Sequence, residues 1–191
     1  MATSEVEICN RALQKIGAKR ITSLTQDAPN ARACNVAYFV LRDMELRNHP
    51  WNFSIKRAEL AADATPPDWG RQNSFTLPSD FLCLRPDYPE DNLNCKDWQI
   101  EGKKIVTNDA APLYIRYTYR VTDPNEMDAL FREALATKLA IEICEEIAQS
   151  NTKKADLKDD YRDIINRARK ANAIENVSAE PPEDTWLTVR G

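Results

Sequence analysis

His49 is the side chain best suited to acid–base, nucleophilic or metal chemistry, because it is the chain's one histidine. It stands between Asn48 and Pro50, at the expected end of a helix. A Ser-His-Asp or Cys-His site would have to use it, yet no G-x-S-x-G nucleophile elbow accompanies it. Metal sites usually need two or more histidines or clustered cysteines. We therefore expect the His49 side chain to interact favourably with the helix dipole or to hydrogen-bond a carbonyl at the helix end. We expect no metal and no cofactor.

The cysteines and glycines also lack the spacing that chemistry needs. The four glycines cannot form a G-x-G-x-x-G motif or a P-loop, so the usual phosphate cradles are excluded. The five cysteines are odd in number and contain no C-x-x-C pair, which predicts reduced thiols. They are Cys9, Cys34, Cys83, Cys95 and Cys144.

Carboxylate pairs are the one catalytic device that the sequence leaves open. Such pairs have no sequence spacing of their own, and the chain holds thirty Asp and Glu residues. Glu145-Glu146 and Asp159-Asp160 are adjacent acids, but acids on the solvated face of a helix are ordinary. We therefore expect no enzyme, while a hydrolase with two carboxylates remains an alternative.

The four tryptophans divide into two groups. Trp51 and Trp98 lie in strand-like patterns and are expected in the core, because each buries a large apolar area there. Trp69, beside Gly70 in a loop, and Trp186, in the final segment, are better suited to an interface. The final segment either docks on a neighbouring molecule or folds back on its own chain. The predicted interface residues are Trp69, Trp186, Leu187 and Arg190.

Charge and composition exclude further classes. The formal net charge is −4, whereas proteins that hold nucleic acid need a concentrated basic surface. No stretch approaches the roughly 20 apolar residues that cross a bilayer, and residues 1–7 do not resemble a signal peptide, so we expect no membrane partner.

Charge is distributed unevenly along the chain. Residues 1–62 carry nine basic against six acidic side chains, whereas residues 123–150 carry two against seven. These opposite poles either orient copies and partners or are merely solvated faces.

Helical periodicity predicts two helices at each end of the chain. Ser4 and Glu7 fit a capping box, and Gly17 ends that first helix. A second helix begins after a cap at Asp27 and ends at Pro50. The two form a hairpin, and the second buries an apolar face. That face consists of Ala33, Ala37, Val40 and Met44, flanked by Val36 and Leu41.

The third helix, from about Asp128 to Ala148, is apolar around most of its circumference and is expected at the centre of the helical core. A fourth runs from about residue 152 to 173.

Between the two helical pairs, the spacing of apolar residues changes to every second residue from Trp51 onward, which predicts short strands. The expected strands lie at 51–55, 74–77, 83–85, 98–100, 104–106 and 113–121, with a hairpin turn at 101–103.

These elements predict an α+β fold, in which a bundle of about four helices carries an inserted antiparallel sheet or barrel. The helical part comprises residues 1–50 and 123–174, and the β part comprises residues 51–122. Residues 175–191 contain Pro181-Pro182 and show no helical or strand period, so we expect an extended C-terminal arm.

Seven segments, in this order along the chain, resemble the tail tubular protein A family, the head-to-tail adaptors of short-tailed bacteriophages. They occur in both helical parts and total 45 of the 191 residues. They are Ile8–Gly17 (ICNRALQKIG), Ile21–Leu24 (ITSL), Asn30–Cys34 (NARAC), Asn48–Phe53 (NHPWNF), Phe75–Leu82 (FTLPSDFL), Ala129–Ala136 (ALFREALA) and Asp184–Leu187 (DTWL).

The resemblance implies a structural subunit of a dodecameric ring in the neck of the virion, assembled in the host cytoplasm. The helical part would dock on the portal protein, and the β part would face the tail nozzle and the attachment of the tail fibres. DNA would pass through the lumen without specific binding. Two alternatives remain open, namely a peptidoglycan-degrading tail protein with a carboxylate pair and a small non-viral interaction module.

Overall fold

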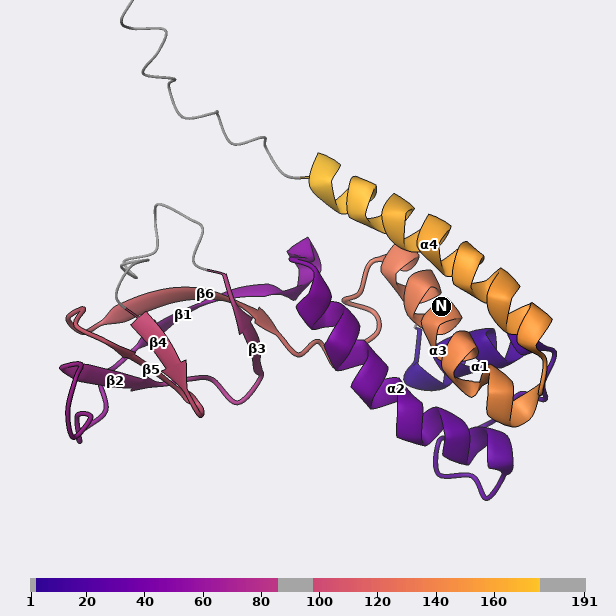
Figure 1. The fold of residues 1–191 in the computed structure, drawn as a ribbon, viewed down its shortest axis with the longest axis horizontal. Helices are drawn as coiled ribbons and strands as arrows, with labels where there is room; N and C mark the ends of the chain where they lie inside the picture. Colours follow the sequence, from indigo (N-terminus) through magenta and orange to yellow (C-terminus); the bar gives the residue numbers. More distant parts are fainter. Residues whose placement is uncertain (1–2, 86–97, 176–191) are drawn as a thin grey trace, which may run out of the picture.

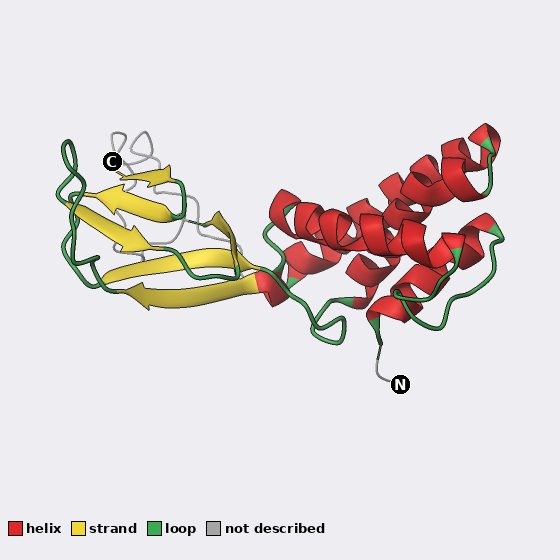
Figure 2. Ribbon diagram, turned by 90° about the horizontal axis from the view of Figure 1, so that it is seen from below, coloured by secondary structure: helices red, strands yellow, loops and turns green. Residues whose placement is uncertain are grey.

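The computed structural model describes residues 3–85 and 98–175. Within these residues the chain has the expected α+β fold, with four α-helices and two three-stranded antiparallel sheets. Helices and strands occupy opposite ends of the molecule (Figure 1, Figure 2). Each end has its own buried apolar core. The expected arm lies almost entirely outside the described residues, which end at Glu175.

Local capping rules explain the first helix. In α1 (Glu5–Ile16), the Ser4 hydroxyl accepts a hydrogen bond from the Glu7 amide, and the Glu7 carboxylate accepts one from the Ser4 amide. Gly17 ends the helix with φ 76°, a left-handed conformation that favours glycine. The predicted capping box and stop are confirmed.

The second helix begins and packs differently from the prediction. The N-cap of α2 (Pro29–Asn48) is Ala28, while Asp27 instead forms an ion pair with Arg32. The buried face of α2 is also not the predicted one, since Val36 is 75% exposed and Val40 67% exposed. Ala33 and Leu41 are buried as predicted, but the rest of the inward face differs. The buried residues of α2 are Ala31, Ala33, Cys34, Tyr38, Leu41, Arg42, Glu45 and Leu46.

Two buried charges explain why α2 is rotated in this way. Burying an ionised group is costly unless it is paired or hydrogen-bonded. The Arg42 guanidinium pairs with the Asp43 carboxylate at 2.8 Å, and the Glu45 carboxylate accepts a hydrogen bond from the Tyr161 hydroxyl, also at 2.8 Å. With both groups satisfied, the face that carries the large Tyr38 side chain can enter the core.

The third helix is the centre of the helical end, as predicted. The Asp128 side chain caps α3 (Ala129–Ile147) by accepting hydrogen bonds from the amides of Leu130 and Phe131. This helix packs against α1, α2 and α4 (Asn151–Ile174), whereas α1 and α2 contact each other much less. The predicted α1–α2 hairpin is therefore not the main packing of this end: the two helices touch where Cys9 meets Cys34, but each packs mainly on α3.

The strands form two facing sheets. One sheet has the order β1-β6-β3 and the other β2-β5-β4. Phe75 and Ile105 from one sheet pack in a common core with Ile115 and Tyr117 from the other. The predicted hairpin between β4 and β5 is confirmed, and Gly102 in its turn has φ 60°. The strands are β1 (Ile55–Leu60), β2 (Asn73–Thr76), β3 (Phe81–Leu84), β4 (Trp98–Glu101), β5 (Lys104–Thr107) and β6 (Leu113–Tyr119).

Trp51 belongs to the helical core, although the prediction placed it in a strand. Residues Asn52–Ser54 form a 3-10 turn, and β1 begins only at Ile55. The buried Trp51 ring packs edge-on against Phe131 of α3, with ring centres 5.1 Å apart. An alternating apolar pattern over five residues does not distinguish this aromatic anchor from a strand.

Polar contacts join the two ends of the molecule. The Arg120 guanidinium, just after β6, forms an ion pair with the Asp43 carboxylate of α2 at 2.7 Å. The Arg47 guanidinium donates to the Leu82 carbonyl, and the Arg85 guanidinium donates to the Arg47 carbonyl. These contacts connect the last turns of α2 to β3 and to the chain after β6.

Candidate functional site

An apolar stripe on α2 faces solvent. Val36, Val40 and Met44 recur at every fourth residue and so lie along one line of the helix surface. Their exposed fractions are 75%, 67% and 38%, and the neighbouring Phe39 is 38% exposed. Single exposed apolar side chains are common on proteins, but a contiguous set marks a surface that contacts something else.

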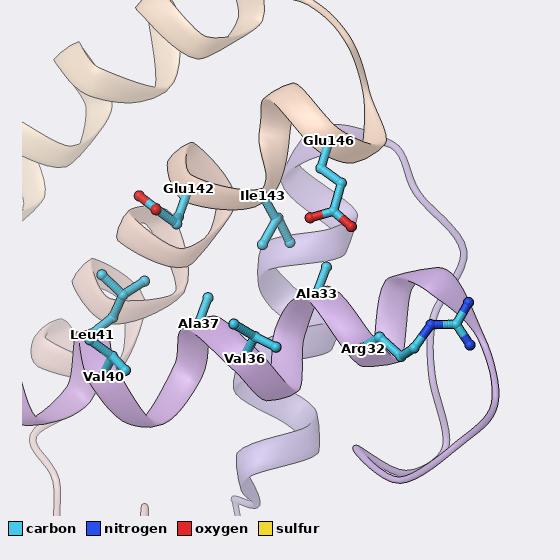
Figure 3. A pocket seen from close by; sticks show the side chains of 9 residues that line it. All are labelled: Arg32, Ala33, Val36, Ala37, Val40, Leu41, Glu142, Ile143 and Glu146. Atoms are coloured by element: carbon cyan, nitrogen blue, oxygen red, sulfur yellow. The ribbon is translucent and has the colours of Figure 1, made fainter.

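The stripe continues into a groove between α2 and α3, which we call the α2–α3 groove. The groove has a volume of about 420 Å³. In Figure 3, Ile143 points from α3 toward α2, and Glu142 and Glu146 lie above the apolar residues of α2. The lining residues are Arg32, Ala33, Val36, Ala37, Val40, Leu41, Glu142, Ile143 and Glu146.

The rim of this groove is acidic. Glu142 and Glu146 are exposed, and neither carboxylate forms an ion pair or a hydrogen bond within residues 3–85 and 98–175. Arg32 pairs with Asp27 and, in Figure 3, extends away from α3. The groove therefore combines apolar walls with two carboxylates, which suits an apolar ligand segment that carries a positive charge.

Trp69, one of the predicted interface residues, lies on the other end of the molecule. It is 88% exposed in the loop between β1 and β2, and it borders a hollow of about 380 Å³ with Asp68, Arg71 and Glu101. The structure does not bring Trp69 to the α2–α3 groove. The other three predicted interface residues, Trp186, Leu187 and Arg190, lie outside the described residues.

His49 stands at the C-cap of α2, where the sequence placed it. Its ring lies edge-on to the Trp51 ring, with centres 4.6 Å apart, and its Nε2 is 3.3 Å from the Asn172 amide nitrogen. Burial, together with the charges of Arg169 and Arg85, lowers the pKa of His49. The ring is therefore neutral at pH 7 and does not act as a cation toward the helix dipole.

The described carboxylates show no feature of a general acid, which requires a raised pKa. Among residues 3–85 and 98–175, every carboxyl group with a clearly shifted pKa is shifted downward. Hydrogen bonds from Lys104 and Thr76 lower the pKa of Asp63 to about 2, and the Lys154 ammonium lowers that of Glu145. Asp159, of the other adjacent acid pair, forms an ion pair with Arg162. These acids hold surface contacts together, while the absence of enzyme activity stays a prediction.

Metal-ligating side chains are not grouped in the part of the chain that the structure describes, where no cluster of three or more His, Cys, Asp or Glu residues occurs. In the same part of the chain, no helix has the length and apolar character needed to span a bilayer. The candidate site is therefore the α2–α3 groove and its exposed stripe.

Sequence reasoning missed this groove because it assigned the stripe to the core. One available signal was that α2 carries apolar residues on two faces, one with Cys34, Tyr38 and Leu41 and the other with Val36 and Val40. That is more apolar surface than a single core contact can cover. Comparison with known proteins adds no assignment, since no protein-family model and no curated protein matches the chain.

Proposed function

We propose that the chain is a structural subunit of a phage head-to-tail adaptor ring, which joins the portal protein to the tail nozzle in the neck of the virion. The residues 1–50 and 123–174 would dock on the portal, and the residues 51–122 would face the nozzle and the tail fibres. The observation that carries this proposal is the exposed apolar stripe of α2 with its adjoining groove. The kind of assembly is inferred from the seven segments that resemble tail tubular protein A and follow one another in the same order.

Association gives the exposed stripe a physical role. Removing a valine side chain from water contributes roughly 1.5–3 kcal/mol, so burying Val36 and Val40 together favours contact between copies. A ring of identical subunits uses a heterologous interface, in which one patch meets a different patch. An apolar groove on one copy and an apolar segment on the next fulfil that requirement.

The charge of the chain is compatible with a DNA channel. A net charge of −4 disfavours stable contact with the phosphate backbone, so DNA can pass without being held. The acidic region 123–150 and the more basic region 1–62 also favour one orientation between copies over the reverse. Assembly would take place in the host cytoplasm, with a dodecameric ring as the product.

Native mass spectrometry and negative-stain images of the purified chain, alone and with the portal protein, test this function. We expect closed rings in at least one of the two samples, with a mass that is an integral multiple of the subunit mass. A chain that stays monomeric in both samples would contradict the proposal and favour a small interaction module. Clearing of a peptidoglycan zymogram that disappears with a single Glu or Asp substitution would favour a hydrolase.

A further inference from the structure

We infer that the α2–α3 groove of one copy receives the segment 176–191 of a neighbouring copy, an inference that rests on the proposed ring. The groove holds no side chain of residues 3–85 or 98–175 other than those that line it. The segment 176–191 contains the three predicted interface residues that lie outside the described residues, Trp186, Leu187 and Arg190. Three properties of the groove and the segment match.

The first match is apolar. Trp186, Leu187 and Val189 lie within four residues of one another in the segment. The α2 side of the groove offers Val36 and Val40, both largely exposed, as partners. Tryptophans that fill pockets near the centre of an interface are among the residues whose removal costs the most binding energy.

The second match is electrostatic. Arg190 follows directly on the apolar residues of the segment, and the rim of the groove carries Glu142 and Glu146 without an ion pair in the described residues. The guanidinium group of arginine donates two parallel hydrogen bonds to a carboxylate, which fixes a register as well as adding energy. The segment also carries Glu180, Glu183 and Asp184, but all three precede the apolar residues, so the match is local: Arg190 follows the apolar cluster as the acidic rim borders the apolar walls.

The third match is length. The Asn172 side chain contacts His49 and Pro50, so α4 ends beside the C-terminal end of α2, while the groove lies along Arg32–Leu41. An extended chain spans at most about 3.3–3.6 Å per residue, so Trp186 can lie roughly 36–40 Å from Glu175. That reach exceeds the length of α2, about 30 Å for its 20 residues, so the segment is long enough to extend beyond its own copy. A closed ring favours the neighbour, because each copy then supplies one segment and one groove to a heterologous interface.

A charge exchange tests the pairing of Arg190 with the rim. In the full chain, Arg190→Glu should weaken ring formation about tenfold in subunit concentration, because a glutamate would face Glu142 and Glu146. Adding Glu142→Lys and Glu146→Lys to that variant should restore assembly to within about threefold of the unchanged chain. Arg167→Glu, on the exposed face of α4, is the matched control and should leave assembly unchanged. If the losses of assembly caused by Arg190→Glu and by the two lysine substitutions simply add in the combined variant, the inference is overturned. It is also overturned if Arg190→Glu alone does not weaken assembly.

Photo-crosslinking identifies the occupant directly. We would replace Leu187 with p-benzoylphenylalanine in the full chain, confirm rings by native mass, irradiate them and map the joined peptides. We expect crosslinks between copies, from position 187 to residues 32–41 or 142–146. Crosslinked products with the mass of a monomer would show that the groove holds the chain's own segment. Crosslinks to other residues would show that the segment binds another surface. Either result overturns this inference and leaves the ring intact, whereas a chain that forms no ring with or without portal overturns the proposed function as well.

Discussion

Changing both Val36 and Val40 to lysine is expected to leave the chain folded and to abolish the proposed assembly into rings. The two side chains are 75% and 67% exposed, so the isolated fold gains little from them. Surface substitutions of this kind usually change the free energy of unfolding by about 0.5 kcal/mol or less. At an interface, each lysine would instead put a charged side chain where the apolar residues of the next copy are expected, and removing that charge from water costs several kcal/mol even with Glu142 and Glu146 nearby. The dissociation concentration of the ring should therefore rise at least about 100-fold.

Sedimentation and native mass would measure assembly, and urea unfolding would confirm that the fold is intact. Ile174→Lys is the matched control, since Ile174 is also β-branched, helical and 83% exposed but lies on α4. The control should assemble like the unchanged chain. If the double valine variant also assembles normally, the exposed stripe of α2 is not the contact between copies.

Trp51→Ala is expected to lower the free energy of unfolding by about 3–5 kcal/mol, a typical cost for deleting a buried tryptophan. Trp51 is 1% exposed, and its ring packs against Phe53 and Phe131. Its Nε1 donates a hydrogen bond to the Glu45 carbonyl at 3.0 Å. Since small proteins are stable by only about 5–15 kcal/mol, this single change removes a large share of the total.

Trp51→Phe provides the control, because phenylalanine keeps an aromatic ring while losing the hydrogen bond and part of the volume. Its cost should be about 1–3 kcal/mol. Urea unfolding followed by circular dichroism would measure both variants. A loss below about 1 kcal/mol for Trp51→Ala would show that the turn at 51–54 is not an anchor of the helical core.

Features fixed by a few neighbouring residues were predictable. The ends of α1 follow from Ser4, Glu7 and Gly17, because a capping box and a left-handed glycine act within a few residues. The β4–β5 hairpin follows from its short turn around Gly102. The central place of α3 follows from its apolar circumference, which needs neighbours on several sides whatever their identity.

Features that depend on distant partners were not predictable. The orientation of α2 depends on the hydrogen bond between Glu45 and Tyr161, which lie 116 positions apart. Periodicity alone ranks charged positions as outward, so it turned Val36 and Val40 inward, although it placed Ala33 and Leu41 correctly. Trp51 was correctly expected in a core, but its partner Phe131 lies in the far half of the sequence, and the alternating pattern suggested a strand instead.

The candidate site was predictable only in part. The exposure of Trp69 agrees with its loop position beside Gly70, while its role at an interface stays a prediction. The α2–α3 groove joins Val36 and Val40 to Glu142 and Glu146, residues about a hundred positions apart that only the packing of α2 on α3 brings together. No spacing rule links them.

A density map of the assembled particle, with or without the portal protein, tests the central claim most directly. The account predicts a closed ring in which Val36 and Val40 of every copy are buried against the next copy. A ring that leaves this face of α2 in open solvent would contradict it. A solitary chain holding a substrate between two acids would contradict it as well.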